Sequence, residues 1–411
     1  MISFKRHTLG NGLRVLHHHD TMTQMVAVNL HYCVGSCNER AGRTGLAHLV
    51  EHLMFTGSDH APSFDDVMQQ AGGSSNAWTS VDATNYYEVL PAFNIATAFW
   101  LERDRLLHLT LAPESVEVQR SVVIEEFKQR HLNVPYGDLS HLMHELAYTE
   151  HPYRWPAVGA RPQDIADITR DDIVDFRARH YSIQNAILCV SGNVEADQAF
   201  ALAEHWLGDI KPSGKPIAIL PTEPEQSEAR EVTVRRPVPN DLLQLAFPMC
   251  GRQHPDFVVC DLISDLLANG KSARFTRHIL NKSDVFAELD AAVEGTLHPG
   301  LFVVRGRLAP GQRMQQAEEL VWRELRRVAE EVTPQSEVTK CANKYRATTN
   351  YELVGYLPKA TRLCQCERLG DANMVNSDVD RYCAITPGDV QRVARALFNP
   401  CRCNTVHYLR E

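Results

Sequence analysis

The chain has 411 residues, enough for two or three domains with buried cores. Hydrophobic residues make up 44% of it and charged residues 23%, which is typical of a soluble globular protein, and it contains no run of about 18 apolar residues that would predict a membrane span. The net charge of −9 argues against nucleic acid as a partner. The first residues, Met1–Leu9, lead into sequence of a folded type without an apolar signal region, so we expect a cytoplasmic protein.

The cysteines indicate reduced thiols rather than a disulfide framework, because there are 11 of them, an odd number, scattered along a long chain. Two close pairs, Cys364 with Cys366 and Cys401 with Cys403, are either half-sites for a second metal or incidental thiols. We favour incidental thiols, because no Cys-x-x-Cys pairs at zinc-finger spacing accompany them.

The chain begins with strands and then enters a helix that carries unusual chemistry. Asn11-Gly12 is a hairpin signal, and Met25–Tyr32 is typical of a strand. Residues 45–55, GLAHLVEHLMF, predict a helix with His48, Glu51 and His52 on one face. Two imidazoles one turn apart can hold two corners of a tetrahedral zinc site, and a carboxylate between them can take a proton from the attacking water. This is the inverted His-x-x-Glu-His pattern.

Chance must be weighed against this interpretation, since a chain with 19 histidines has some probability of containing the five-residue pattern at random. A third ligand decides the matter, and it should be a carboxylate on another helix. Glu126 qualifies, within a predicted helix over residues 119–128. Glu125 is a poorer candidate if Glu126 faces the histidines, because neighbouring helical residues point about 100° apart.

The pattern at 48–52, followed 74 positions later by Glu126, resembles the pitrilysin and insulin-degrading enzyme family, which includes mitochondrial processing peptidase. The resemblance implies that His48, His52 and Glu126 bind one Zn²⁺ per chain and that Glu51 is the general base. Gln119 departs from the family, which often has an acidic residue there. That departure concerns a residue expected to contact one of the metal ligands, and it does not change the set of metal ligands.

Two strands, 74–80 and 84–90, follow a short helix over 64–71 and predict a hairpin. The hairpin is either a plain structural element or, as the resemblance implies, an exposed edge on which a substrate peptide adds as an extra strand. The positions that match the family's substrate strand are Asn76, Ala77 and Trp78.

A near-copy of the metal pattern lies in a later predicted helix that starts at about Leu139. It contains His141, His144 and Glu145, but it lacks a glutamate between the two histidines. We therefore assign this helix to packing.

The second half of the chain repeats the plan of the first. Thr169 is a plausible N-cap of a helix that leads to a buried strand at 186–190, and Thr386, which lies 217 positions further on, opens a similar helix before a strand at 403–408. Residues 211–230 hold four prolines and are interpreted as a linker. We predict domains 1–210, with the metal site, and 231–411, without it. The fold class that the family resemblance implies is α+β, with two tandem homologous domains, each a largely antiparallel sheet with helices packed on one face.

The function that the resemblance implies is a zinc metalloendopeptidase that cleaves oligopeptides or unfolded polypeptides in a chamber formed by a dimer. Active family members carry an arginine and a tyrosine in the second half, where this chain has Asn281 and Glu288. A paralogous partner subunit would then supply the missing pair. The alternatives are an active homodimer that uses a residue such as Arg277, and a non-catalytic homologue like the core subunits of a respiratory complex. A zinc lyase of small thioethers is a weaker alternative, since such enzymes are much shorter.

Overall fold

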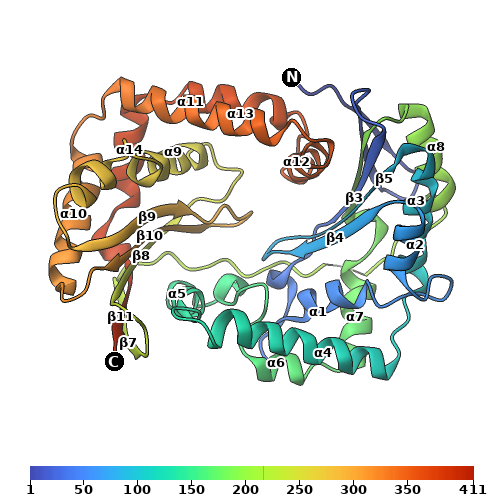
Figure 1. Ribbon diagram of the computed structural model, residues 1–411, viewed down its shortest axis with the longest axis horizontal. Coiled ribbons are helices and arrows are strands. Elements are labelled where there is room, and N and C mark those ends of the chain that lie inside the picture. Colours follow the sequence, from blue (N-terminus) through green and yellow to red (C-terminus); the bar gives the residue numbers. More distant parts are fainter. Residues whose placement is uncertain (216) are drawn as a thin grey trace. The chain divides into compact units, whose positions relative to one another are not determined.

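The computed structural model describes residues 1–215 and 217–411, and the chain divides into two compact units (Figure 1). Unit 1 contains residues 1–128, 155–221 and 350–376, and unit 2 contains residues 129–154, 222–349 and 377–411. Each unit therefore includes one segment from the other half of the sequence.

Unit 1 is built on a six-stranded sheet and the helices that pack on it. Its strands are β1 Lys5–Thr8, β2 Arg14–His19, β3 Met25–Tyr32, β4 Ser74–Thr79, β5 Thr84–Pro91 and β6 Ala186–Gly192. Its helices are α1 Leu46–Leu53, α2 Phe64–Gln70, α3 Ile95–His108, α4 Pro113–Phe127, α6 Pro162–Ala166, α7 Arg170–His180, α8 Ala196–Leu207 and α12 Tyr356–Arg368.

The strand order of this sheet is β1-β2-β6-β3-β5-β4, which leaves β4 at an edge. All neighbouring strands are antiparallel except β2 and β6, which run parallel. The order fits the expected largely antiparallel sheet, and it places the strand that was predicted to receive substrate where one side of its backbone has no sheet neighbour.

The sheet of unit 1 is apolar on both faces, which corrects the expectation that helices cover one face only. Leu188 and Val190 of β6 join the core beneath α1, α3 and α4, whereas the alternating residues Ile187 and Cys189 pack with α12. Asn29 of β3 lies on the α12 side, where the Thr361 hydroxyl donates to its amide oxygen at 3.2 Å. A strand buried on both faces needs a second covering layer, and α12 from the far half of the sequence provides it.

Unit 2 contains a five-stranded sheet with its own helices. Its strands are β7 Arg230–Arg236, β8 Leu242–Met249, β9 Phe286–Val293, β10 Gly300–Leu308 and β11 Asn404–Arg410. Its helices are α5 Leu139–Ala147, α9 Phe257–Ala268, α10 Met314–Glu330 and α14 Pro387–Leu397, together with most of α11 Gln335–Glu352 and of α13 Met374–Cys383.

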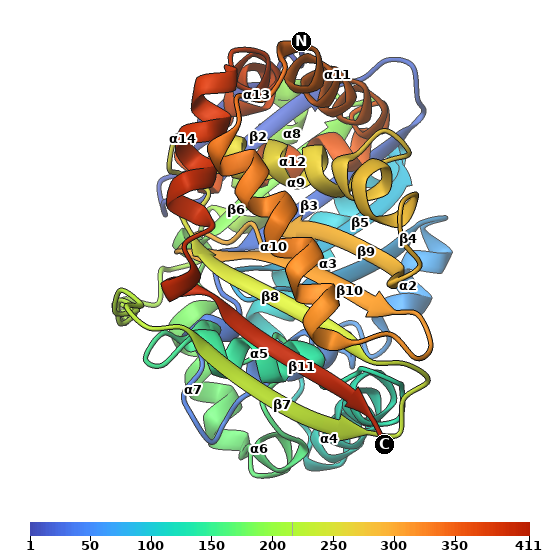
Figure 2. The same cartoon turned by 90° about the vertical axis from the view of Figure 1, so that its left-hand side faces the viewer.

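The two sheets have the same topology once β1 is set aside. The order in unit 2 is β7-β11-β8-β10-β9, which matches β2-β6-β3-β5-β4 strand for strand, including one parallel pair, β7 with β11. Figure 2 shows these strands side by side with α10 and α14 in front of them. Thr169 and Thr386 both cap their helices through capping boxes. The predicted fold class, with two homologous α+β halves, is confirmed.

The compact units do not follow the predicted boundaries at residues 210 and 231. The segment with α5 belongs to unit 2, where α5 contacts β11, and the segment with α12 belongs to unit 1. Residues 211–215 and 217–229 form no helix or strand, and β7 begins at Arg230; Pro216 of the predicted linker lies outside the described residues. The division into sequence domains stays a prediction.

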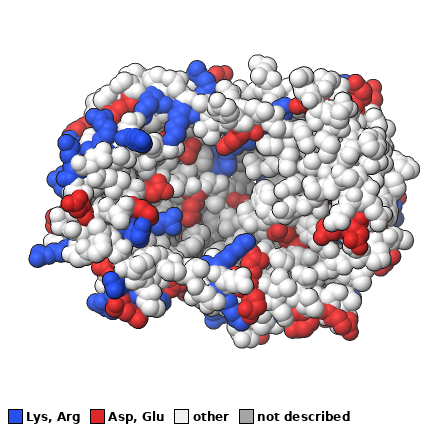
Figure 3. All heavy atoms as spheres, in the orientation of Figure 1, with Lys and Arg blue, Asp and Glu red and all other residues white. Residues whose placement is uncertain are grey.

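Two surface properties bear on partners. Among the described residues, no helix is both long enough and apolar enough to cross a membrane. On the face shown in Figure 3, acidic and basic side chains both occur, and several basic side chains gather at its upper left.

Candidate active site

Helix α1 begins at a turn that only glycine tolerates well. Gly45 has φ +86°, and a Cβ added there would lie 2.9 Å from both Ile165 and the carbonyl oxygen of Val158. The first amides of the helix donate to the buried carboxylate of Glu39, Gly45 N at 2.9 Å and Ala47 N at 2.7 Å. Burial raises the pKa of Glu39 to about 8 despite these hydrogen bonds, which favour the ionised form.

The apolar side chains of α1 decide which face carries the chemistry. Leu49, Val50 and Leu53 are fully buried in the core of unit 1. The periodicity of the helix therefore turns His48, Glu51 and His52 away from that core, and α1 packs against α4 and β4. The expected helix is confirmed, and its three polar residues share one face.

Helix α4 brings the third predicted ligand to the histidines. Oε2 of Glu126 lies 3.4 Å from Nε2 of His52 and 3.8 Å from Nε2 of His48. One ligand atom from each of the three residues lies within 4.8 Å of the others. Glu125, its neighbour, is turned away and pairs with Lys128 at an exposed position, at 2.6 Å.

These three side chains fit a zinc ion by their chemistry and by their spacing. Two imidazole nitrogens and one carboxylate oxygen are typical of a catalytic zinc site with a fourth position left open. Zinc bonds of about 2.0–2.1 Å place two ligands of a tetrahedron about 3.3 Å apart, close to the separations between the Glu126 oxygen and the two histidine nitrogens.

Gln119 of α4 occupies the contact behind His52. Its Oε1 lies 3.3 Å from Nδ1 of His52. An amide oxygen accepts a hydrogen bond from a ring N–H, and this leaves Nε2 of the imidazole as the nitrogen with the available lone pair. Gln119 is thus placed to make the contact for which the family often uses an acidic residue.

Glu51 is held by a residue of the edge strand. The hydroxyl of Thr79, the last residue of β4, donates a short hydrogen bond to Oε2 of Glu51. Thr79 directly follows the predicted substrate-binding residues Asn76, Ala77 and Trp78, but the sequence pattern indicated no role for it. Only the packing of β4 against α1 reveals the contact.

The predicted substrate-binding residues lie on this strand. Asn76 is exposed, and the N–H of Ala77 donates to its Oδ1 at 2.8 Å. The indole of Trp78 lies on the same face of the strand as Asn76, opposite Ala77 and Thr79, and meets His31 edge-on, with ring centroids 6.0 Å apart.

The near-copy of the metal pattern is used in packing within unit 2. Nδ1 of His144 lies 2.9 Å from the carbonyl oxygen of Tyr153, and Nε2 lies 3.0 Å from Oε2 of Glu294. Burial opposes a charge on His144, but Glu294 outweighs burial and raises the pKa of this histidine. A histidine paired in this way ties α5 to the end of β9.

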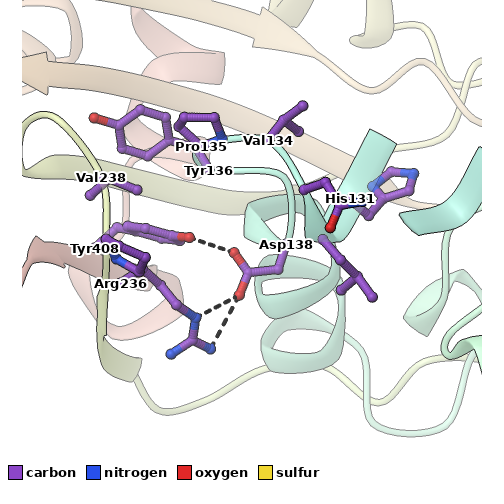
Figure 4. A pocket seen from close by; sticks show the side chains of 11 residues that line it. His131, Val134, Pro135, Tyr136, Asp138, Arg236, Val238 and Tyr408 are labelled. Atoms are coloured by element: carbon purple, nitrogen blue, oxygen red, sulfur yellow. Dashed lines mark hydrogen bonds and ion pairs between the residues drawn. The ribbon is translucent and has the colours of Figure 1, made fainter. Parts of the chain in front are cut away.

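Unit 2 also contains a pocket of about 440 Å³ that sequence reasoning missed (Figure 4). Its polar groups are tied to one another: Asp138 accepts from the Tyr408 hydroxyl at 2.7 Å and from Nε of Arg236 at 3.2 Å. Much of the remaining lining is apolar, from residues such as Val134 and Val238. This arrangement is typical of a packing network.

Comparison with known proteins gives the family. The profile described as "Insulinase (Peptidase family M16)" matches residues 14–160, and the profile "Peptidase M16 inactive domain" matches residues 167–345. The "Zinc protease PqqE" of Helicobacter pylori is 33% identical over 67% of this chain and 63% of its own length. The "Probable mitochondrial-processing peptidase subunit beta" of Schizosaccharomyces pombe is 26% identical over 64% of this chain and 58% of its own.

The chain thus aligns with less than two-thirds of the length of these two curated relatives. A solved structure, "The crystal structure of a protease from Helicobacter pylori", covers 99% of this chain and 100% of its own, with a TM-score of 0.94 and 27% identity. Two profiles of one family together match most of residues 14–345, and the fold agrees over 99% of the chain; the chain belongs to peptidase family M16.

Proposed function

We propose that this chain is a zinc-dependent endopeptidase in which His48, His52 and Glu126 hold one Zn²⁺ and Glu51 is the general base. The observation that carries the proposal is the convergence of the three ligand atoms within 4.8 Å, from two helices, with Glu51 on the same helical face as the histidines. The relatives named as zinc proteases support the same class of activity.

When bound, the zinc ion would polarise the scissile carbonyl and make the attacking water more acidic. Glu51 would accept the proton of that water and later deliver it to the leaving amine. Thr79 fixes one oxygen of the Glu51 carboxylate, so the base would not have to be ordered during the reaction.

The substrate would be an extended peptide that pairs with the free edge of β4 at Asn76, Ala77 and Trp78. Backbone pairing is insensitive to most side chains, which favours oligopeptides and unfolded polypeptides over folded proteins. Because Thr79 ends the same strand, a peptide on this edge would lie beside the base.

The test of the proposal uses Glu51→Gln, which preserves shape but cannot accept a proton. We expect the variant to retain the zinc and to lose about 10²–10⁴-fold in kcat on a quenched fluorescent peptide. Glu125→Gln, an exposed carboxylate next to the ligand, is the matched control and should be fully active. Glu126→Gln should lose the zinc itself. Near-normal turnover by Glu51→Gln would contradict the assigned role.

We also propose that the active enzyme is a heterodimer with a paralogous subunit. Glu288 stands where active relatives are expected to have a tyrosine, and its carboxylate pairs with Arg307 at 2.7 Å. That arginine lowers the pKa of Glu288 and keeps it ionised. A carboxylate cannot stabilise an oxyanion, so a partner would have to supply the donor.

The homodimer remains the second candidate, because Arg277 is exposed close to Asn281 and could serve in place of the missing arginine.

A further inference from the structure

A second cluster of metal-binding side chains lies in unit 1, apart from the proposed catalytic ligands. It consists of His60, Asp104 and His108, and we refer to it as the α3 cluster. One ligand atom from each residue lies within 4.8 Å of the others. None of these residues belongs to the inverted motif or to the substrate strand.

The fold assembles the α3 cluster from a helix end and a loop. Asp104 and His108 are one turn apart on α3, so they share a face. His60 comes from the loop between α1 and α2. Backbone pairing fastens this loop to the end of α3, because Asp59 N donates to the His108 carbonyl at 3.0 Å and Thr110 N donates to the Gly57 carbonyl at 3.2 Å.

Asp104 is a fixed anion at the base of the cluster. Its side chain is 4% exposed, and it accepts from the Ser58 hydroxyl and from the backbone N–H of His60. These hydrogen bonds fix the carboxylate in place, so a metal would meet a preformed carboxylate ligand.

The two histidines lie over this carboxylate and remain open to solvent. Nδ1 of His60 is 2.6 Å from Oδ1 of Asp104, and the rings of His60 and His108 are perpendicular, with centroids 5.1 Å apart. Their side chains are 61% and 42% exposed. A divalent cation could use one ring nitrogen from each histidine together with a carboxylate oxygen of Asp104.

We propose that His60, Asp104 and His108 form a second site for a divalent transition metal, with Zn²⁺ as the best match to two imidazoles and one carboxylate. Asp59 is placed to assist, since its Oδ2 lies 3.7 Å from Nδ1 of His108. The loop that carries His60 runs from α1 to α2, and the chain continues from there into β4. A metal in the α3 cluster therefore fastens the connection between the proposed zinc helix and the substrate strand.

The first experiment measures zinc stoichiometry on the full chain after removal of metal with a chelator. We expect the wild-type chain to bind two zinc ions and Glu126→Gln to bind one. Adding His108→Ala or His60→Ala to Glu126→Gln should abolish the remaining ion. His205→Ala, which removes an exposed histidine of α8, is the matched control and should leave that ion bound.

The outcomes separate this site from the proposed catalytic one. If Glu126→Gln binds no zinc, or binds it equally well with His60 and His108 replaced, the α3 cluster is not a metal site. If instead the wild-type chain binds a single ion that is lost in His108→Ala but kept in Glu126→Gln, the α3 cluster is a metal site and the catalytic assignment fails.

A second experiment measures directly whether metal in the α3 cluster stabilises the loop that carries His60. In the Glu126→Gln background, zinc should raise Tm and slow hydrogen exchange of the amides at residues 56–61, and both effects should vanish with His108→Ala. The His108 side chain is 42% exposed and lies 3.7 Å from Asp59, so its replacement should change the metal-free Tm little. His60→Ala also removes the 2.6 Å contact to the buried Asp104, so each variant is compared with its own metal-free form. Equal zinc protection in the His108→Ala variant would overturn the proposal.

Discussion

At the scale of single residues, two side chains that are neither proposed metal ligands nor the proposed base contact the residues of the candidate site. Gln119 lies behind His52, and Thr79 fixes Glu51. Both contacts join α1 to another element, α4 in the first case and β4 in the second. The geometry of the ligands and of the base therefore depends on how these three elements pack.

Thr79→Val tests the role of one such partner. Removing a hydrogen bond to a charged group costs about 1.5–3 kcal/mol, so kcat should fall by about 10- to 100-fold. Zinc content should stay unchanged because Thr79 is not a proposed metal ligand, and KM should stay unchanged because the proposed pairing at Asn76, Ala77 and Trp78 uses backbone groups. Thr79→Ser retains the hydroxyl and should restore most of kcat. A Thr79→Val enzyme with full kcat would show that Glu51 needs no such support.

At the scale of elements, the start of α1 makes the folding stability of the chain depend on pH, through Glu39. Glu39 accepts hydrogen bonds from the first amides of the helix, and burial raises its pKa to about 8 in the folded chain, against 4.5 for a free side chain. The folded chain therefore binds an extra proton between these pH values. The stability that this proton contributes is fully present below pH 4.5 and is lost as pH rises through 8.

Glu39→Gln should remove this dependence, because the amide resembles the protonated acid and does not titrate. The free energy of unfolding of the wild-type chain should fall relative to that of the variant by up to about 1.4 kcal/mol per pH unit between the two pKa values. Urea unfolding across this range, with a chelator present so that metal binding does not contribute, measures the difference. If the free energy of unfolding changes with pH in the same way for the wild type and for Glu39→Gln, the pKa of Glu39 is not raised.

The edge strand β4 provides a second test at this scale. The N–H of Ala77 donates to the Asn76 side chain rather than to β5, so it faces the free edge of the sheet. Ala77→Pro removes that donor at a position where an edge strand tolerates proline. We expect KM for peptides to rise by about tenfold, the loss of one hydrogen bond, with zinc content unchanged.

Ala77→Ser keeps the N–H and serves as the control for this experiment. If the folded Ala77→Pro protein binds peptides as tightly as the wild type, strand addition at this edge is wrong.

At the scale of the whole molecule, the chain contains one fold twice and the candidate chemistry once. Helix α9 occupies in unit 2 the place that α1 has in unit 1, directly after the central strand, yet its sequence FVVCDLISDLLA offers no pair of histidines. The profile that matches residues 167–345 is likewise described as an inactive domain. The three proposed zinc ligands, His48, His52 and Glu126, all lie in unit 1.

The heterodimer proposal is tested by assaying the purified chain alone and then with a co-purifying homologue. Loss of one oxyanion donor costs about 10²–10³-fold in rate, so the isolated chain should be slower by that factor. In the isolated chain, Glu288→Tyr should recover part of the rate, and Arg277→Ala should change little. Full activity of the isolated chain, together with its loss in Arg277→Ala, would favour the homodimer.

Local patterns in the sequence were sufficient for several features. The capping boxes at Thr169 and Thr386 depend on residues three positions apart, and α1 depends on its own periodicity and on Gly45. The duplication was visible because both halves retain the same helix starts and buried strands. Such signals lie within a few residues of one another, so the sequence alone predicted the face of α1 that carries His48, Glu51 and His52, and its resemblance to a known family implied the fold class.

Tertiary structure alone decided which distant segments meet. Nothing near residue 360 of the sequence indicates that α12 covers the sheet of unit 1, and no local signal joins Thr79 to Glu51 or His60 to Asp104. These contacts depend on which apolar faces are buried against one another. That arrangement depends on every segment of the chain, so no short stretch of sequence predicts it. The side chains that hold the base and that form the α3 cluster are consequently properties of the packed chain.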